Sequence, residues 1–351
     1  MASSFSARLS LHVILLSVDL LLLSSVVTPS PGFYSAIFNF GDSLTDAGNL
    51  AFFSGVKAPA SRPPYGETYF HRPTGRFTDG RIILDFIGIN FALHRLSHLS
   101  FSFLLLTIHG AEQAMRLPLV PPYSAGRGRH NFAKGANFAV AGARAIGNAF
   151  YEAEGFNITW EDYSLGTQLK WFDQLLQSSS PSVLGRQSLS FSPAYDMISS
   201  LFMVGEIGIN DYNHVLLDDR PIDSVRAYVA PVVHAIGSAI DALVRTGAKM
   251  VVVSGVFPVG CIPVFLAKFR TQDAGAYDPA TGCLKWLNEF SQHHNVLLRR
   301  QLGRLRQAHP RATIVYADIY GALMSIYASP RRFGEPQIPA SHSDELTASF
   351  S

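Results

Sequence analysis

The chain has 351 residues, of which 48% are hydrophobic and 15% are charged, and its formal net charge is +2. Disordered chains combine low hydrophobicity with high net charge, so this composition excludes that class of protein. The weak net charge and the lack of a basic tract interleaved with aromatic residues also argue against nucleic acid as a partner.

The N-terminus predicts a secretory signal peptide over residues 1–30. Arg8 precedes an apolar stretch at 13–27 that Asp19 interrupts, and small or helix-breaking residues follow at 28–32. A basic start, a short apolar core and a small-residue end are typical of a cleaved signal peptide. A membrane anchor is the alternative, but a spanning helix needs about 20 apolar residues. We therefore expect a secreted, extracellular chain that has no transmembrane span after cleavage.

Short apolar runs alternate with helical patterns along the chain. Apolar residues recur at helical spacing over 225–245 and 286–305, and Gly247 stands just past the first of these segments, as is common at helix ends. Four runs are typical of buried parallel strands, at 36–40, 201–204, 250–254 and 313–316. Such alternation indicates an α/β fold with a parallel sheet covered on both faces. Because there is no internal repeat and no linker, we predict a single domain over residues 31–351.

A serine follows the first predicted strand directly, in the sequence Gly41-Asp42-Ser43. If Ser43 opens a helix, its hydroxyl lies where helix N–H groups favour a developing negative charge. In a parallel sheet, ligands bind beyond the carboxyl ends of the strands, which is where this serine falls. The alternative is that Ser43 only caps the helix, since Ser and Asp are preferred cap residues.

Two further segments combine small residues with polar ones. Residues 135–143 are mostly small, and small residues let backbone N–H groups approach a substrate closely, as an oxyanion hole requires. Residues 205–212 follow the strand at 201–204 and contain Asn210, whose side-chain amide can donate to an oxyanion. Each segment also has a plainer interpretation, a tightly packed turn for the first and a turn residue for Asn210.

These three segments, in this order, resemble the plant-type GDSL esterase/lipase family of the SGNH hydrolases. The resemblance extends over about residues 33–334 and includes further matches at 64–70, 74–81, 117–123 and 260–263. It implies a three-layer α/β/α sandwich around a parallel, flavodoxin-like sheet.

Residue by residue, the resemblance implies that Ser43 is the nucleophile of an ester hydrolase. Gly142 and Asn210 then supply oxyanion donors together with the backbone N–H of Ser43. The implied reaction transfers an acyl group from a lipid, acylated carbohydrate or other small-molecule ester to water through an acyl-serine intermediate. Neither a metal nor an organic cofactor is implied, and the pair His94 and His98 lacks the Glu of a zinc-binding helix.

The sequence departs from the family pattern at its C-terminal end. The family's Asp-x-x-His block, whose His is the general base, has no counterpart downstream of Asp318, and residues 335–351 are polar without helical or strand periodicity. The general base is therefore unassigned. His293 and His294 fall on the late polar helix and are expected to be solvated. The alternative function is a catalytically inactive family member that binds acyl or cell-wall ligands.

A second departure is an insertion over residues 88–113, which holds an apolar run at 101–106. It separates residues 81–87 from 114–118, which should follow one another almost directly. Errors of transcript processing would explain both the insertion and the altered C-terminal end, and a divergent paralogue is the rival explanation. We expect the insertion to add nothing essential to the core.

The positions of the cysteines and of one asparagine agree with export. Cys261 and Cys283 can form a disulfide in an oxidising compartment, or remain as two buried thiols. Asn157 begins a glycosylation sequon, which is plausible only if the chain is secreted.

Overall fold

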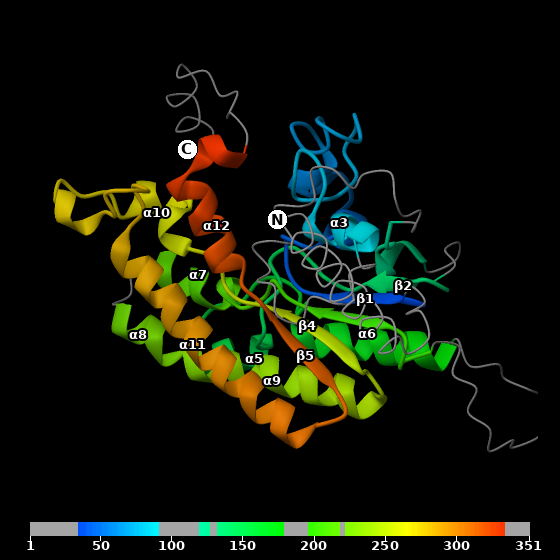
Figure 1. Ribbon diagram of the computed structural model, residues 1–351. Coiled ribbons are helices and arrows are strands. Elements are labelled where there is room, and N and C mark those ends of the chain that lie inside the picture. Colours follow the sequence, from blue (N-terminus) through cyan, green and yellow to red (C-terminus); the bar gives the residue numbers. More distant parts are fainter. Residues whose placement is uncertain (1–33, 91–118, 127–131, 179–195, 218–221, 334–351) are drawn as a thin grey trace, which may run out of the picture.

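The computed structural model describes residues 34–90, 119–126, 132–178, 196–217 and 222–333. Five strands form one sheet with the order β2-β1-β3-β4-β5, and every neighbouring pair is parallel. They are β1 (Ile37–Phe40), β2 (Gly135–Asn137), β3 (Leu201–Val204), β4 (Met250–Ser254) and β5 (Thr313–Ala317). This is the strand order of a flavodoxin-like sheet, so the predicted α/β class and sheet type are confirmed (Figure 1).

Helices connect the strands and cover the sheet. Helices α5, α6, α9 and α11 lie on one side of the sheet and α3 lies on the other (Figure 1). The α-helices of the described residues are α2 (Asn49–Ser54), α3 (Ile83–Asn90), α5 (Asn148–Ala153), α6 (Leu165–Ser178), α7 (Ile209–Leu217), α8 (Ile222–Ala227), α9 (Val229–Thr246), α10 (Pro263–Lys268), α11 (Lys285–Ala308) and α12 (Ile319–Ala328). Short 3-10 turns are η1 (Gly55–Lys57), η2 (Pro59–Ser61), η4 (Tyr123–Gly126), η5 (Val259–Cys261), η6 (Ala274–Ala276) and η7 (Pro330–Phe333).

The strands are continuous apolar runs because both faces of the sheet are buried. Successive side chains of a strand point to opposite faces. Phe38 and Phe202 point to the face covered by α6, α9 and α11, and their rings stack with centroids 5.2 Å apart. Ile37 and Leu201 point the other way, into a smaller apolar cluster that includes Leu84 of α3. Two layers of helices therefore enclose the sheet.

Strand β2 was not predicted from the sequence, and it is an edge strand of three buried residues, Gly-Ala-Asn. Its composition lacks the β-branched residues that mark a strand. Gly135 has φ 102°, and a Cβ atom there would lie 1.9 Å from the carbonyl oxygen of Ile37. Only glycine lets β2 approach β1 this closely, so the strand is set by its neighbour rather than by its own propensity.

The two predicted helices are present with different ends. The segment expected at 225–245 is divided into α8 and α9, with Tyr228 between them. Helix α9 ends where expected, because Gly247 adopts φ 119° just past Thr246 and its N–H binds the last turn. The segment expected at 286–305 lies within α11.

One helical stretch, Ser224–Thr246, is long and apolar enough to cross a membrane by length and composition. Half of its most apolar part is buried inside the protein. The side chains of Val232, Ile236 and Ile240 in α9 are among the most buried of the large core. Core helices pass the same test, so packing against the sheet accounts for the hydropathy of α9.

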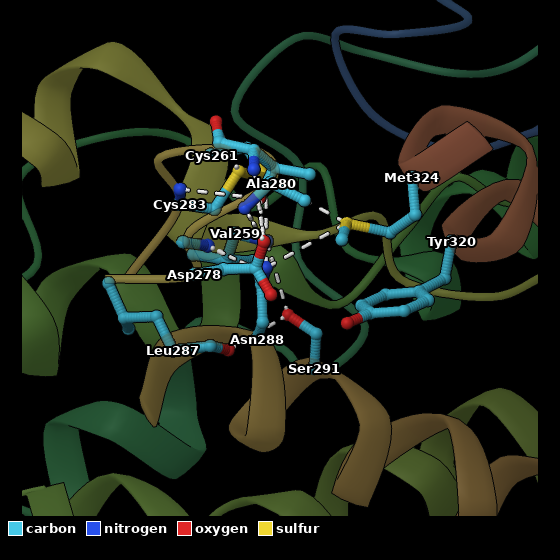
Figure 2. The surroundings of a disulfide bond; sticks show 12 residues. Val259, Cys261, Asp278, Ala280, Cys283, Leu287, Asn288, Ser291, Tyr320 and Met324 are labelled. Atoms are coloured by element: carbon cyan, nitrogen blue, oxygen red, sulfur yellow. Dashed lines mark hydrogen bonds between the residues drawn. A yellow bond between two sulfur atoms is a disulfide. The ribbon is translucent and has the colours of Figure 1, made fainter. Parts of the chain in front are cut away.

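Cys261 and Cys283 form a disulfide, with Cα atoms 4.4 Å apart. The bond ties the loop that follows β4 to the start of α11 (Figure 2). Asn288 of α11 reinforces this junction, since its Oδ1 accepts a hydrogen bond from the Gly260 N–H at 2.9 Å. Both cysteines are buried.

Several predicted segments lie outside the described residues. They are the signal peptide at 1–30, residues 91–113 of the insertion and the C-terminal segment at 335–351. The first residues of the expected insertion, 88–90, continue α3. The expected domain boundaries therefore stay predictions.

Candidate active site

Ser43 lies in a turn between β1 and α2, at the carboxyl end of the sheet. The Oδ1 atom of Asp42 accepts a hydrogen bond from the Leu44 N–H at 3.1 Å, and its carbonyl accepts one from the Thr45 N–H at 3.2 Å. The expectation that Ser43 opens a helix is wrong, since residues 43–45 form a turn. An Asp side chain that binds nearby backbone N–H groups favours a turn over a helix at this point.

The hydroxyl of Ser43 has no hydrogen-bond partner among the described residues. Among the residues that the structure describes, none forms a hydrogen bond with its Oγ atom or with its backbone N–H. Ser43 also does not cap α2, because the carboxylate of Asp46 accepts the N–H groups of Asn49 at 2.6 Å and Leu50 at 3.1 Å. The side chain is half-buried, so a substrate can reach it.

Gly142 is the exposed residue of a turn that follows β2, and its neighbours Ala141 and Ala143 are buried. The turn is closed by a hydrogen bond from the Ala143 N–H to the Val140 carbonyl at 2.9 Å, and Gly142 itself has φ 83°. A Cβ atom at this position would meet nothing within 4 Å, so the conformation and not crowding requires glycine. No described residue accepts a hydrogen bond from the Gly142 N–H. This N–H group is available to a ligand.

Asn210 is the second residue of α7 and is half-buried. Its Nδ2 atom donates to the Ala143 carbonyl at 2.9 Å, and its Oδ1 atom accepts from Asn213 at 3.1 Å. A side-chain amide carries two N–H bonds, so one donor of Asn210 remains after these contacts. Hydrogen bonds at both the nitrogen and the oxygen of the Asn210 side chain therefore fix the orientation of its amide plane.

Hydrogen bonds join the three segments that the sequence analysis singled out. The Val140 N–H donates to the Gly41 carbonyl at 3.2 Å, and the Asp42 N–H donates to the Glu206 carbonyl at 2.8 Å. With the bond from Asn210 to Ala143, every segment is tied to another. The structure therefore brings the segments of Ser43, Gly142 and Asn210 together, and their catalytic roles stay predictions.

Four carboxyl groups, those of Asp42, Asp46, Glu206 and Asp211, are buried around the serine turn. Burial raises the pKa of Asp42 to about 7, and the pKa values of Asp46 and Asp211 to about 6. Burial, and then the charge of Asp42, raise the pKa of Glu206 well above its ordinary value. Asp42 Oδ2 and Glu206 Oε2 have no hydrogen-bond partner among the described residues. These two carboxyls therefore keep their protons to a higher pH than an exposed acid does.

Two polar side chains that hold the turn were missed from the sequence. Gln168 of α6 binds both backbone groups of Gly41, with Oε1 to its N–H and Nε2 to its carbonyl, each at 2.9 Å. Asp46 also accepts a hydrogen bond from the Ala141 N–H at 2.9 Å, next to Gly142. Asp46 stands three residues after Ser43, which is a weak local signal, whereas Gln168 binds a residue 127 positions away.

No described histidine side chain contacts Ser43. His294, expected to be solvated, is fully buried, and its Nδ1 atom lies 2.7 Å from the Tyr212 hydroxyl. Burial lowers the pKa of His294 to about 3, so it stays neutral. The expectation was wrong because α11 turns this position toward α7, while His293 is exposed as expected. His71 is exposed and contacts a nearby carbonyl at 3.1 Å.

Two further features of the described residues concern metal binding and glycosylation. Within the described residues, no group of three or more His, Cys, Asp or Glu side chains is arranged to hold a metal ion. Asn157 of the glycosylation sequon is exposed in the loop that follows α5.

The flavodoxin-like sheet and the three joined segments at its carboxyl edge define a hydrolase of the SGNH type. The profile of the family described as GDSL-like Lipase/Acylhydrolase matches residues 37–346. The chain belongs to this family, whose esterases and lipases act on esters.

Individual relatives support this assignment. A GDSL esterase/lipase of Arabidopsis thaliana is 40% identical over 333 residues, which cover 94% of this chain and 76% of the relative. A second Arabidopsis thaliana GDSL esterase/lipase is 40% identical over 311 residues, or 88% of this chain and 71% of the relative. A sinapine esterase of Brassica napus is 36% identical over 337 residues, or 95% of this chain and 78% of the relative.

Proposed function

We propose that the protein is a serine ester hydrolase in which Ser43 is the nucleophile. The observation that carries this proposal is the unengaged Ser43 hydroxyl, held in a turn that is hydrogen-bonded to the segments of Gly142 and Asn210. Its substrates are lipid, acylated carbohydrate or other small-molecule esters.

The reaction has two acyl-transfer steps. Ser43 Oγ attacks the ester carbonyl carbon while its proton passes to a general base. The oxyanion accepts hydrogen bonds from the N–H groups of Ser43 and Gly142 and from the Asn210 amide. The bond to the alcohol then breaks, and the alcohol leaves with the proton held by the base. Water attacks the acyl-serine with help from the same base, which finally returns a proton to Ser43.

The general base decides between two candidate functions. The printed sequence has no Asp-x-x-His downstream of Asp318, where the family places its base. Removing the base of a comparable triad lowers kcat by about 10⁶-fold. A chain that lacks this base should therefore turn over slowly. A catalytically inactive member that binds acyl or cell-wall ligands is the second candidate.

Hydrolysis of p-nitrophenyl esters and labelling by a serine-directed phosphonate test the proposal on the full chain. We expect the phosphonate to label Ser43, and Ser43→Ala to lose both labelling and turnover. Ser238→Ala, which changes an exposed serine of α9, is the matched control and should behave like the parent. Labelling elsewhere with Ser43 untouched would overturn the assignment, and ligand binding without labelling or turnover would favour the inactive binder.

We also propose that the protein is secreted and glycosylated at Asn157. The supporting features are the signal-like N-terminus, the disulfide between Cys261 and Cys283 and the exposed sequon. Expression in eukaryotic cells should release the chain into the medium, with an endoglycosidase-sensitive mass that Asn157→Gln removes. Intracellular retention without a glycan would contradict the proposal.

A further inference from the structure

The C-terminal half of α11 and the turn that follows it carry five arginines and no acid. Residues 290–317 contain neither Asp nor Glu. The arginines, all exposed, are Arg299, Arg300, Arg304, Arg306 and Arg311. None of them forms a salt bridge with a carboxyl group of the described residues. We call these five residues the arginine face.

The four arginines of α11 lie on the side of the helix opposite its buried leucines. At the helical repeat, their directions fall within an arc of about 160° around the helix axis. Leu298, Leu302 and Leu305 point into the large core from the other side. Helix α11 runs alongside β5, the edge strand of the sheet (Figure 1). The arginine face therefore lies on the outer surface of the molecule.

Two of the arginines are held in place by β5. The Nε atom of Arg306 donates to the Ile314 carbonyl at 2.8 Å, and the guanidinium of Arg299 lies 5.4 Å from the ring centroid of Tyr316. A guanidinium has five N–H bonds, so Arg306 keeps the others for a ligand. Because these two side chains are already ordered, a ligand that binds them loses less free energy to ordering.

The stability of the helix does not explain the arginine face. A cation near a helix C-terminus interacts favourably with the helix dipole, but only Arg306 lies in the last turn of α11. Arg300 and Arg304 are four residues apart, so their like charges repel each other on the helix surface. An anionic partner offsets this repulsion.

The spacing of the arginines fits a long anion. Arg299 and Arg306 are seven residues apart, which is about 10 Å along the helix axis. A single carboxylate or phosphate contacts one or two guanidinium groups, whereas a linear polyanion contacts several at once. After the first contact each further one is intramolecular, so weak contacts add up to a useful affinity.

The residue types indicate the chemistry of the partner. The planar fork of a guanidinium binds a carboxylate through two parallel hydrogen bonds, which an ammonium group cannot do. A membrane-binding helix places exposed apolar residues beside its cations, and a single-stranded nucleic acid needs exposed aromatic rings for base stacking. Helix α11 exposes no large apolar or aromatic side chain. We propose that the arginine face binds a linear polysaccharide that carries carboxylate groups.

A polymer bound there leaves the proposed active site open. Arg306 contacts the second residue of β5, and Arg311 precedes this strand, so both lie near the amino end of the sheet. Ser43 follows β1 at the carboxyl end. Since the strands are parallel, these are opposite edges. The inference goes beyond the proposed function and does not rest on it.

Binding is tested with polygalacturonate on the full chain carrying Ser43→Ala, so that the polymer stays unchanged during the measurement. Isothermal titration calorimetry should show saturable binding at low ionic strength that weakens about tenfold at high salt, because salt screens exposed charges. Fully methyl-esterified polygalacturonate has the same backbone without the charges, and we expect no binding of it.

Variants locate this binding on α11. The double variant Arg300→Gln, Arg304→Gln should bind polygalacturonate about tenfold more weakly, since two charge-assisted contacts are lost. It leaves the arginines that contact β5 in place, and Gln forms helices almost as well as Arg. The matched control Arg331→Gln, Arg332→Gln removes the same charge from η7, which follows α12 at the other end of the molecule (Figure 1), and should bind like the parent.

Vesicles of phosphatidylcholine with phosphatidylserine and a double-stranded DNA oligonucleotide test the other anionic partners under the same conditions. We expect both to bind more weakly than polygalacturonate. Tighter binding of either one, no binding of polygalacturonate, or equal binding of the charged and the methyl-esterified polymer would overturn the proposal. So would a double variant of α11 that binds as tightly as the parent while the two have equal melting temperatures.

Discussion

Ser43 is positioned by its neighbours and not by its own side chain. Gln168 fixes both backbone groups of Gly41, and Asp42 fixes the Leu44 N–H. These bonds are buried or half-buried, so losing one partner leaves an unpaired polar group at a cost of about 1–3 kcal/mol. The serine hydroxyl makes none of these contacts, which leaves it free for chemistry.

Asn210 is predicted to act on the transition state. Asn210→Ala should lower kcat by about 10²–10³-fold with little change in KM, because an oxyanion donor binds the developing charge and not the ground-state ester. Initial rates on a p-nitrophenyl ester check this. Gln292→Ala, which removes an exposed side-chain amide of α11, is the matched control and should keep the activity of the parent. A loss in kcat no larger than that of the control would count against the assignment.

Asp42 makes the stability of the fold depend on pH. Burial raises its folded-state pKa to about 7 from an ordinary value of 3.8. The folded state therefore holds the proton more tightly than the unfolded state. Its contribution to stability is full below the unfolded pKa and is lost as pH rises toward 7. The pKa values of Asp46, Asp211 and Glu206 shift in the same direction and steepen this fall.

Asp42→Asn should flatten the dependence of stability on pH. The change in unfolding free energy between pH 4.5 and 7.5 should shrink by about 3 kcal/mol, as measured by urea unfolding. Asp173→Asn, which alters an exposed acid of α6, should keep the slope of the parent. Parallel curves for the parent and Asp42→Asn would refute the shifted pKa.

Among the elements of the fold, the order of the strands in the sheet brings the three site segments together. Strand β1 pairs with β2 on one side and with β3 on the other, so the segments that follow all three strands meet at one edge. Asn210 contacts Ala143 across 67 positions of sequence, and Ala139 and Val140 bind back to the first segment. Strand pairing accordingly places the oxyanion donors, and hydrogen bonds between the loops fix their orientation.

The disulfide should stabilise the junction between β4 and α11. Cys261 and Cys283 are 22 positions apart, and closing a loop of that length stabilises the fold by about 3 kcal/mol in the chain-entropy model. The double variant Cys261→Ser, Cys283→Ser should therefore unfold at lower guanidinium concentration by this free energy. The parent kept in reducing agent should match the variant. A loss of under about 1 kcal/mol would show that the junction is held by other contacts such as the bond between Gly260 and Asn288.

At the scale of the whole molecule, the sheet has two apolar faces of unequal size. The larger core joins Phe38 and Phe202 to α6, α9 and α11, whereas the smaller one includes Ile82 and Leu84 at the start of α3. Removing a methyl-rich side chain from a buried core costs several kcal/mol. Mutations outside α3 that leave this helix intact should therefore destabilise the fold less than mutations within it.

Deleting residues 91–113 should leave the melting temperature unchanged or raise it. The prediction rests on the sequence, in which this segment interrupts an otherwise continuous passage, and the deletion keeps α3 (Ile83–Asn90) complete. Calorimetry of the full chain and of the deletion variant checks this. A second variant replaces the segment by a Gly/Ser linker of equal length. It separates the effect of losing the side chains from the effect of shortening the chain. A fall of more than about 4 °C in both variants would show that the segment packs into the fold.

The strands at 201–204 and 250–254, the long helices and the order of the three site segments could all be predicted from the sequence alone. A central strand is buried on both faces, so its residues form a continuous apolar run. A helix is buried on one face, so its apolar residues recur at helical spacing. Both patterns can be recognised in a short stretch of sequence. Ser43 and Asn210 were visible because their segments follow predicted strands, whereas residues 135–143 were visible because they are mostly small. Their roles came from resemblance and not from local pattern.

Strand β2, the interior position of His294, the raised pKa values of Asp42 and Glu206 and the support from Gln168 follow only from the fold. Each depends on contacts between residues far apart in the chain. Gln168 binds Gly41 from 127 positions away, and His294 is buried because α11 packs its polar-looking face against α7. A local pattern records spacing and average burial, but solvation and hydrogen-bond partners are set by whichever element the fold packs beside a residue.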